Sequence, residues 1–449
     1  MSGNFRSFDR ETLFLMPPSV QDWLPKNHLA RFIVEIVEQL DLRALRESYA
    51  GRGSAAYHPE MLVALLFYGY STGVRASRKV EAATYDSVPF RYIAANSHPD
   101  HDTIADFRAR FLPQLGQIFE QLLVLASETG LLKVGHVSVD GTKIRANASK
   151  HNAISLKRAS QLEQRFRREA QRMLELAEQA DREDVSDDLD VPAELERRED
   201  RIRAIQEAKE RIRKRETERV EREKAERVNT IAERRRFEDV NGRRFETQPN
   251  RHRIRRNPNA QINLTDDDSR IMPSSEGFVQ AYNGQLAVDC DSMLIAGCQI
   301  AQSPIDSRQL PAMLGALCNL PIGKPTAVLA DAGYFSELNV ERCAANDIAP
   351  YFAVNREKHH WGLRHWKTPK VPSADASALT QMRYRLKTSE GRQTYARRKS
   401  TVEPVIGNLK RSMGFRQFLL RGIEKVGGEW TLICASWNIR RMHTLRWAP

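Results

Sequence analysis

The stretch HVSVDGTKIRA, residues 136–146, decides the fold class of this chain. Val137 and Val139 alternate with Ser138 and Asp140, and this period of two predicts a β-strand. The chain before this stretch has helical spacing and no comparable alternation. The strand therefore marks the change from a helical N-terminal part to a part that contains a sheet.

Residues 1–133 are predicted to form an all-α domain. HLARFIVEIVEQL (28–40) has apolar side chains at helical spacing, and HPEMLVALLFYGYSTG (58–73) has a proline near its start and a glycine at its end. Further helices are expected over 77–85 and within 101–130. A DNA-binding module and a dimerisation or packing domain would both show this pattern, so both interpretations stay open.

Residues 155–265 form a charged insertion after the first strand. Between Ser155 and Val240 the sequence has 23 Lys or Arg and 24 Asp or Glu. With only a thin apolar seam, this composition predicts two long helices around a break at 184–192, joined by salt bridges. Such a hairpin would be a solvated spacer or an arm that contacts DNA or a second copy. Residues 241–275 show no periodicity and predict a loop.

The remaining chain, 266–449, is expected to complete the domain that residues 134–154 begin. FVQAYNGQLAVD (278–289) and LIAGCQIA (294–301) predict an antiparallel hairpin, and TAVLAD (326–331) predicts a strand buried on both faces. The other expected elements are helices over 306–319, 335–346, 401–413 and 427–446 and a strand over 348–354. Without the insertion, three antiparallel strands are followed by alternating helices and strands. This order predicts an α/β fold with a mixed sheet of the ribonuclease H type.

Three carboxylates occupy informative positions in these elements. Asp140 comes directly after residues 136–139 of the first predicted strand, and Asp331 ends the central strand in AVLADAGYFSE. Glu403 lies in STVEPVIGNLKRSMGF. Sites in open α/β sheets gather at the carboxyl ends of strands. Pro404 predicts that a helix starts or kinks beside Glu403, whose side chain would then reach the sheet.

Carboxylates that converge repel each other unless they are protonated or bridged by cations. An all-oxygen ligand set suits Mg²⁺, and Mn²⁺ is expected to substitute. Two such ions about 4 Å apart activate a water or a 3′-hydroxyl and stabilise the leaving oxygen of a phosphodiester. The three acids therefore predict metal-dependent chemistry on a phosphodiester.

The charge of the chain points to a polyanionic partner. The net charge is +12 over 449 residues, and basic side chains concentrate in residues 241–256, 355–370 and 392–421. Basic runs that contain aromatic residues, such as Trp361 and Trp366, suit a nucleic-acid backbone and its bases. Solvated surface is the alternative interpretation of each run.

Cysteine usage and hydropathy bear on the location of the protein. The five cysteines form no CxxC pair, which argues against a disulfide framework and a zinc ribbon. We see neither a signal peptide nor a stretch of eighteen uncharged apolar residues. The sequence predicts a soluble cytoplasmic protein without a membrane partner.

With these motifs the sequence resembles bacterial insertion-sequence transposases of the DDE type. The resemblance rests on VDGTKIRANASKH, ADAGYFSE and TVEPVIGNLKRSMGF, and on HPEMLVALLFYGYSTGVRASRK near the N-terminus. It implies a ribonuclease H-like core with Asp140, Asp331 and Glu403 as catalytic metal ligands. It also implies Mg²⁺-dependent cleavage and strand transfer of double-stranded DNA at the terminal repeats and the target. A homodimer in the synapse, acting at the bacterial nucleoid, is implied as well.

Related transposases carry a Tyr-Arg-Glu-Lys pattern around the glutamate. The spacing from Arg398 to Glu403 is one residue longer than that pattern, so Arg397 competes with Arg398. Arginine and lysine at these positions would hold phosphates beside the cleaved bond. The candidates for DNA contact are Tyr395, Arg398, Lys410, Lys143, Arg411 and Arg416.

Two other functions are compatible with the sequence. A nuclease of the same fold would cut DNA without joining strands. A DNA-binding protein derived from a transposase would have lost catalysis, but all three acids are present. A strand-transfer assay distinguishes these alternatives.

Overall fold

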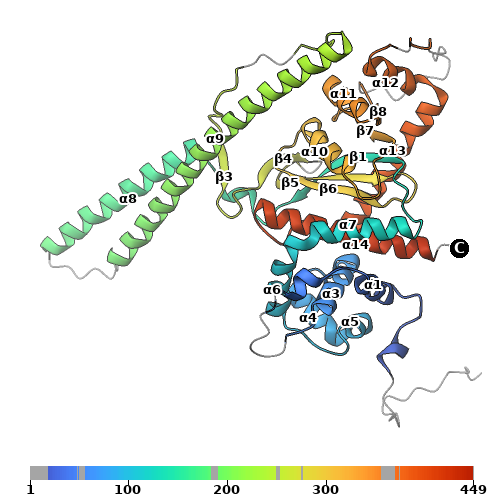
Figure 1. Cartoon of the computed structure of the whole chain (residues 1–449). Coiled ribbons are helices and arrows are strands. Elements are labelled where there is room, and N and C mark those ends of the chain that lie inside the picture. The colour runs from blue at the N-terminus through green and yellow to red at the C-terminus, as the bar shows by residue number, and fades with distance from the viewer. Residues whose placement is uncertain are drawn as a thin grey trace, which may run out of the picture. The chain divides into compact units, whose positions relative to one another are not determined.

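The computed structural model describes residues 19–47, 49, 56–183, 191–248, 253–274, 277–354, 370–373 and 375–447 (Figure 1). The chain divides into two compact units. The N-terminal unit comprises residues 1–131, 412–414 and 431–449, and the sheet unit comprises residues 132–411 and 415–430. The domain boundaries expected from the sequence, at 133, 154 and 265, stay a prediction.

The N-terminal unit is helical, as the sequence predicts. The helix α3 is buried along almost its whole length, and it ends at Gly73, whose φ of +84° is the left-handed conformation that glycine adopts most readily. The short helices α2 and α5 were not predicted. The elements are η1 (Val20–Trp23), α1 (Leu29–Glu38), α2 (Arg43–Glu47), α3 (Pro59–Thr72), α4 (Ser77–Asp86), α5 (Val88–Ile93), α6 (His101–Phe111), η2 (Leu112–Gln114) and α7 (Leu115–Glu128).

The sheet unit is built on a mixed sheet. The strand order is β4-β5-β1-β7-β8, and β6 pairs with the same strand, β5, further along its length. The ladders of β5 with β1, β4 and β6 are antiparallel, whereas β1, β7 and β8 are parallel. The predicted mixed α/β sheet is confirmed. The strands are β1 (His136–Arg145), β4 (Arg270–Ser274), β5 (Gly277–Asp289), β6 (Ile295–Ala301), β7 (Ala327–Ala330) and β8 (Ala349–Phe352).

Helices from the second half of the chain cover this sheet. α10 contacts β6, α11 and α12 contact β8, and α13 contacts β1 and β5. All four residues of β7 are buried, as expected for a central apolar strand. The elements are η4 (Asp306–Arg308), α10 (Leu310–Cys318), α11 (Glu337–Ala345), α12 (Ala378–Lys387), α13 (Ser389–Arg411) and α14 (Ile423–Arg446).

The prediction that a helix starts beside Glu403 is wrong. α13 begins at Ser389, and Pro404 lies inside it. Proline lacks the N–H that would bond to the carbonyl group four residues earlier. Buried side chains on both sides of the proline, Val402 and Val405, pack the helix onto the sheet. This packing keeps the helix continuous despite the missing hydrogen bond.

The two ends of the insertion meet in a small two-stranded ladder. β2 (Ala153–Ser155) pairs antiparallel with β3 (Gln261–Asn263), and η3 (Lys150–Asn152) precedes them. Between the two strands run α8 (Leu156–Glu183) and α9 (Val191–Asn241), in agreement with the predicted pair of helices. Of the predicted break over 184–192, residues 184–190 lie outside the described residues, and α9 already begins at Val191.

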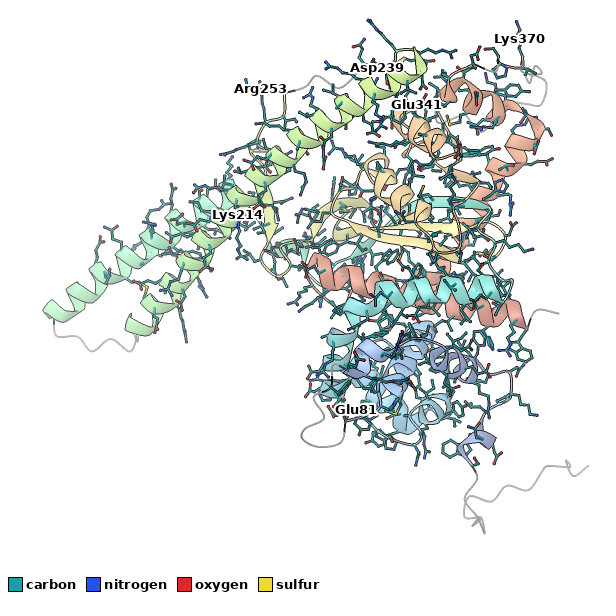
Figure 2. The ribbon with its side chains drawn as sticks, viewed as in Figure 1. Glu81, Lys214, Asp239, Arg253, Glu341 and Lys370 are labelled. Carbon is teal, nitrogen blue, oxygen red and sulfur yellow. The ribbon has the colours of Figure 1, made fainter. Side chains whose placement is uncertain are left out.

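The two insertion helices lie side by side for part of their length (Figure 1). A small apolar cluster joins them to the β2–β3 ladder through Ile154, Ile205, Ile212 and Ile262. Around Lys214, charged side chains surround α9 (Figure 2). The expected loop over 241–275 is corrected, because this stretch contains β3 and β4.

Among the described residues, every helix is too short or too polar to cross a membrane.

Candidate active site

The parallel part of the sheet places two carboxylates side by side. Asp140 lies on β1, and Asp331 follows the last residue of β7. The ladder pairs Val139 with Ala330, so the next residue of each strand lies at the same level. Side chains at matching positions of paired strands point to the same face of the sheet. Asp140 and Asp331 are therefore neighbours across two strands.

Asp140 lies in a crowded negative environment. The pKa of Asp140 is raised from 3.8 to about 6, first by burial and further by the negative charges of Asp331 and Asp306. The Gly141 N–H, which donates to Asp140 Oδ1 at 2.8 Å, and the Arg398 guanidinium oppose this rise. Because the pKa is raised despite them, burial and the neighbouring acids outweigh these two stabilising groups.

Arg398 joins Glu403 to Asp140. Its Nη1 lies 3.5 Å from Asp140 Oδ2, and its Nη2 lies 3.3 Å from Glu403 Oε1. Arg398 is only 8% exposed, whereas 52% of the Glu403 side chain is exposed. A planar guanidinium can contact two carboxylates at once, which a lysine ammonium does poorly. The three predicted acids are thus linked, with Glu403 held through the arginine.

Arg397, the alternative to Arg398 in the sequence, faces a different partner. Its guanidinium pairs with the Asp291 carboxylate, which follows β5. Consecutive residues of a helix point about 100° apart, so two adjacent arginines reach different surroundings. Of the two, Arg398 is the one beside Asp140 and Glu403.

The lysine next to the first acid contacts a carboxylate that the sequence interpretation missed. Lys143 Nζ lies 3.5 Å from Asp306 Oδ1 and 3.4 Å from the Pro304 carbonyl oxygen. Lys143 was predicted to bind DNA. In the structure its charge is turned toward Asp306 on η4.

The other predicted DNA contacts lie on or just after α13. Tyr395 and Lys410 are half-buried on this helix, and Lys410 stands seven residues, or two turns, after Glu403 on the same face. Arg411 and Arg416 are exposed. The Arg416 Nε donates to the Lys410 carbonyl oxygen at 3.2 Å, which fixes the turn that follows the helix.

Asp306 completes the group of acids around β1. Its Oδ1 accepts hydrogen bonds of 2.9 Å from Asn283 Nδ2 and from Gln285 Nε2, two fully buried side chains of β5. Gln285 Oε1 in turn accepts from the Tyr334 hydroxyl. Burial and the charges of Asp306, Asp140 and Asp331 raise the pKa of Tyr334, which therefore stays a neutral donor. The only sequence signal was the presence of amide side chains, Asn283 and Gln285 among them, within a strand.

The donor chemistry of the site suits a hard divalent cation. The carboxylates supply oxygen ligands, and Asp331 and Asp306 add negative charge near the buried Asp140 that a cation would relieve. Within the described ranges no group of three His, Cys, Asp or Glu side chains is already arranged to hold a metal ion. Glu403 is turned to Arg398 instead. Asp140, Asp331 and Glu403 fit such an ion by chemistry, and Glu403 would have to exchange its arginine for it.

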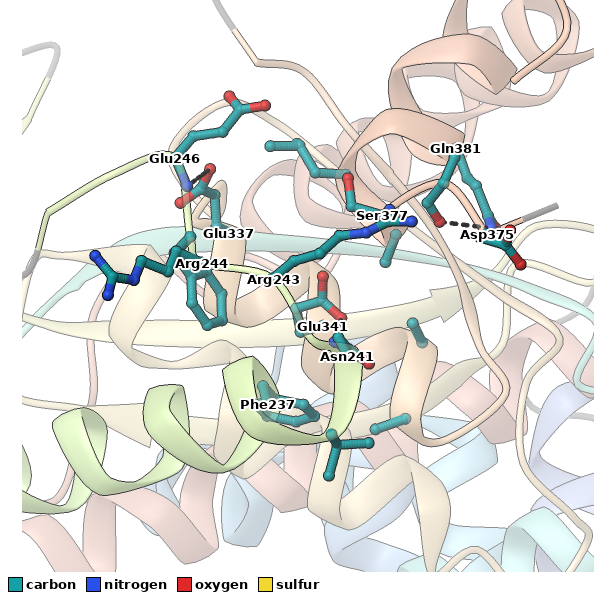
Figure 3. Close-up of a pocket in the computed structure, with 17 residues that line it drawn as sticks. Phe237, Asn241, Arg243, Arg244, Glu246, Glu337, Glu341, Asp375, Ser377 and Gln381 are labelled. Atoms are coloured by element: carbon teal, nitrogen blue, oxygen red, sulfur yellow. Dashed lines mark hydrogen bonds between the residues drawn. The ribbon is translucent and has the colours of Figure 1, made fainter. Parts of the chain in front are cut away.

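A pocket of about 540 Å³ lies elsewhere in the sheet unit (Figure 3). Its lining comes from the end of α9, the segment after it, α11 and the start of α12. Glu337 in its wall accepts from the backbone N–H groups of Glu246 and Thr247, at 3.1 and 2.8 Å. The wall contains none of the three predicted acids. We interpret this pocket as the junction at which the insertion returns to α11.

One basic run falls outside the described residues. Of residues 355–370, which include Trp361 and Trp366, the structure describes only Lys370. The predicted DNA contact by this run therefore stays a prediction.

Two family models match the chain. The Transposase domain (DUF772) matches residues 18–110, within the N-terminal unit, and the Transposase DDE domain matches residues 364–443, which include Glu403. No curated protein and no solved structure matched the chain. Both models describe transposase domains, and together they support an insertion-sequence transposase of the DDE type.

Proposed function

We propose that this transposase cuts and joins DNA at transposon ends with Asp140, Asp331 and Glu403 as its catalytic carboxylates. One observation carries the proposal. Asp140 and Asp331 occupy matching positions on the paired strands β1 and β7, and Arg398 ties Asp140 to Glu403 of α13. Three acids from segments far apart in the sequence are thereby gathered at one place.

The fold that we propose for the sheet unit is ribonuclease H-like. The order β6-β5-β1-β7-β8, with β5 antiparallel to its neighbours and the last three strands parallel, supports this assignment. In this proposal, residues 134–154 and 266–449 form the catalytic domain and residues 155–265 form the insertion. Residues 1–133 form a DNA-binding or dimerisation domain.

In the proposed site, Asp140, Asp331 and Glu403 would hold two Mg²⁺ ions, or Mn²⁺ in their place. When bound, the ions would activate a water or a DNA 3′-hydroxyl and stabilise the departing 3′-oxygen. The chain's own residues prepare the site. Gly141 orients Asp140 through its N–H, and the Gly333 N–H holds Asp331 Oδ1 at 2.8 Å. The second oxygen of Asp140, Oδ2, faces Arg398 Nη1 at 3.5 Å.

Basic residues on and after α13 would hold the DNA. Lys410 shares a helix face with Glu403, so a phosphate beside the cleaved bond would lie within its reach. Arg411 and Arg416 are exposed and extend this surface. Tyr395 and Arg398 would contact the same strand, and Arg398 would do so once Glu403 exchanges partners.

Double-stranded DNA, at the terminal repeats and at the target, is the proposed substrate. Joining two ends requires that two copies of the site act together, so we propose a homodimer in the synapse. The place of action would be the bacterial nucleoid in the cytoplasm.

The test is cleavage and joining of labelled end DNA taken from the native locus. The full chain is compared with Asp331→Asn in Mg²⁺, and with Asp347→Asn as a matched control. Asp347 is an exposed carboxylate that pairs with Lys324 away from the site. We expect the native chain and the control to cut and join, and Asp331→Asn to bind the ends without cutting.

Other outcomes separate the alternatives. Equal cutting by all three proteins would show that Asp331 is not catalytic. Cutting without joining by the native chain would favour the nuclease. Tight binding without cutting by every protein would favour a DNA-binding protein that has lost catalysis.

A further inference from the structure

We propose that Asp306 is a positioning residue of the active site, a fourth carboxylate that together with Asp140 and Asp331 sets the affinity for the divalent cation. The inference rests on the proposed function, because it assigns Asp306 to the same site. It concerns a residue that lies on η4, in the connection after β6, and that no motif marked.

Asp306 is held in place by two buried amides, one of which, Asn283, also donates to the Ser303 carbonyl oxygen at 3.0 Å. Asn283 and Gln285 are completely buried on β5, and each donates one amide N–H to Asp306 Oδ1 at 2.9 Å. The Tyr334 hydroxyl donates to Gln285 Oε1, which fixes the amide with its nitrogen toward Asp306. Buried amides are costly unless they are paired, so this chain gives Asp306 one defined position.

The residue after the first acid leaves the space that this arrangement needs. A Cβ at Gly141 would lie 2.7 Å from Asp306 Oδ1 and 3.0 Å from Asn283 Oδ1. Real Cβ atoms do not approach oxygen so closely, so any side chain at this position would displace the group. The glycine beside Asp140 thus lets Asp306 and its amides lie directly against the catalytic strand.

Asp306 also faces the second acid. A Cβ at Gly333 would lie 3.0 Å from Asp331 Oδ1 and 3.8 Å from Asp306 Oδ2, so both carboxylates border this glycine. The amides and Lys143 contact Oδ1 of Asp306, which leaves Oδ2 toward Asp331. The negative charge of Asp306 therefore acts on both catalytic aspartates.

A buried oxygen beside this group lacks a donor. Asn283 Oδ1 has no hydrogen-bond partner within the described part of the chain, although Asn283 is fully buried. It is aimed at Gly141, next to Asp140. An acceptor in this state is satisfied when a water, free or bound to a cation, enters the site.

The charges do not balance without a cation. Among the described residues, Arg398 pairs with Asp140 and Lys143 pairs with Asp306, and Arg398 is shared with Glu403. A fourth carboxylate strengthens the attraction for a divalent ion, and losing such a partner typically costs about 10- to 100-fold in metal affinity.

The experiment measures Mn²⁺ binding to the full chain without DNA, by electron paramagnetic resonance of the free ion. The variants are Asp306→Asn, Asp306→Glu, Asp140→Asn and the surface control Asp347→Asn. Asparagine keeps an oxygen that can accept from Asn283 and Gln285, so thermal unfolding without metal should change little. We expect Asp306→Asn to weaken Mn²⁺ binding about 10-fold or more. Asp306→Glu, which keeps the charge, should retain more affinity, and the control should match the native chain.

The outcomes distinguish this inference from the proposed function. If Asp140→Asn weakens binding and Asp306→Asn does not, Asp306 has no role in the site while the proposed function stands. If neither variant weakens binding, the site itself is misassigned and this inference falls with it. Equal losses in Asp306→Asn and Asp306→Glu would assign the effect to packing and overturn the proposed role of the charge.

Discussion

At the scale of single residues, the candidate site contains a buried carboxylate whose negative charge lowers the stability of the folded state. Asp140 is mostly buried, next to Asp331 and near Asp306, and its pKa is raised to about 6. A carboxylate whose folded-state pKa exceeds its unfolded value of 3.8 favours the folded state only while it is protonated. Its contribution to stability is present below about pH 4 and is lost as the pH rises through 6. At neutral pH the charge of Asp140 therefore opposes folding.

Asp140→Asn should consequently stabilise the fold at pH 8 while it abolishes catalysis. A shift of about two pKa units corresponds to a gain of up to about 3 kcal/mol in the free energy of unfolding. The gain should fall below about 1 kcal/mol at pH 4, where the carboxyl is protonated in the folded state and about half protonated in the unfolded state. Chemical denaturation in EDTA at the two pH values measures it.

The control for this prediction is Asp347→Asn, which makes the same change at an exposed position. It should leave the free energy of unfolding nearly unchanged at both pH values. A loss of stability in Asp140→Asn at pH 8 would contradict the crowding of negative charge around β1.

Two adjacent arginines offer a second prediction at this scale. Arg398→Lys should lower the rate of DNA cleavage about 10- to 100-fold, because one ammonium cannot hold Asp140 and Glu403 together. Arg397→Lys should keep nearly the native rate, since Arg397 pairs with Asp291 instead. Single-turnover cleavage measures both. Equal effects of the two variants on the cleavage rate would show that the contact of Arg398 with Asp140 and Glu403 does not determine this rate.

The sequence predicted some of these residues for a clear physical reason. Asp140 and Asp331 stand out because strands are recognisable from their period and bring side chains to one edge. Asp306 could not be found in this way, since its partners Asn283 and Gln285 lie on another strand and only the folded sheet brings them together. The choice between Arg397 and Arg398 likewise needed the direction of each side chain on α13.

At the scale of elements, β5 is the strand on which the sheet unit is organised. It pairs with β1, β4 and β6, and its Gly284 lies against the ring of Trp430 at the start of α14. The Trp430 Nε1 donates to the Gln285 carbonyl oxygen at 3.2 Å, so the ring is fixed in this position. The helix and the strand pack closely only because position 284 has no side chain.

Gly284→Ala should therefore destabilise the fold. Its Cβ would lie 2.8 Å from the buried Trp430 ring, and overpacking of this kind costs about 1–3 kcal/mol. Gly315→Ala is the matched control, because a Cβ at this position in α10 meets nothing within 4 Å. It should stabilise the helix by up to about 1 kcal/mol. Urea denaturation of both variants gives the comparison, and similar effects of the two would refute the close contact.

The elements that sequence reasoning found and missed differ in their length and periodicity. β1, β5, β6 and β7 were predicted, because several residues in each repeat one period or form one apolar run. β3 and β4 were missed, since strands of three and five residues carry little pattern and form only against β2 and β5. α13 was predicted too short, because a proline ends helices in general but not where the packing on both sides holds the helix.

At the scale of the whole molecule, two of the described attachments of the insertion have different consequences. Ser155 pairs with Gln261, and the Leu156 N–H donates to the Ala260 carbonyl oxygen, so its two ends are adjacent. The end of α9 returns to α11, where Glu233 accepts from Arg342 Nε and Nη2 at 2.9 and 2.6 Å. Because its two ends are adjacent in the β2–β3 ladder, the insertion can be removed without opening the sheet. The contact of α9 with Arg342, in contrast, stabilises α11.

Removal of residues 157–259, with the ends joined by Asn-Gly, should yield a chain that still folds cooperatively. The ends already lie at hydrogen-bonding distance across an antiparallel ladder, and a two-residue turn closes such a ladder. The variant should be less stable than the native chain, because Arg342 and the apolar residues Ile154 and Ile262 lose their partners. Guanidinium denaturation followed by circular dichroism measures the change. Mn²⁺ binding should be retained, since Asp140, Asp331 and Asp306 all remain.

A shorter deletion separates the two attachments. Removing residues 172–195 with a glycine-serine link trims the hairpin beyond the ion pair of Arg198 with Glu169 and the pair of Lys209 with Glu163, whose atoms lie 4.0 and 2.7 Å apart. This variant keeps the apolar cluster and the contact with α11, so its stability should match that of the native chain. If the trimmed chain folds and the fully deleted chain aggregates, the contact of α9 with α11 is a part of the core. If both variants fold and bind Mn²⁺, the insertion is needed neither for folding nor for metal binding. Its function is then contact with DNA or with a partner.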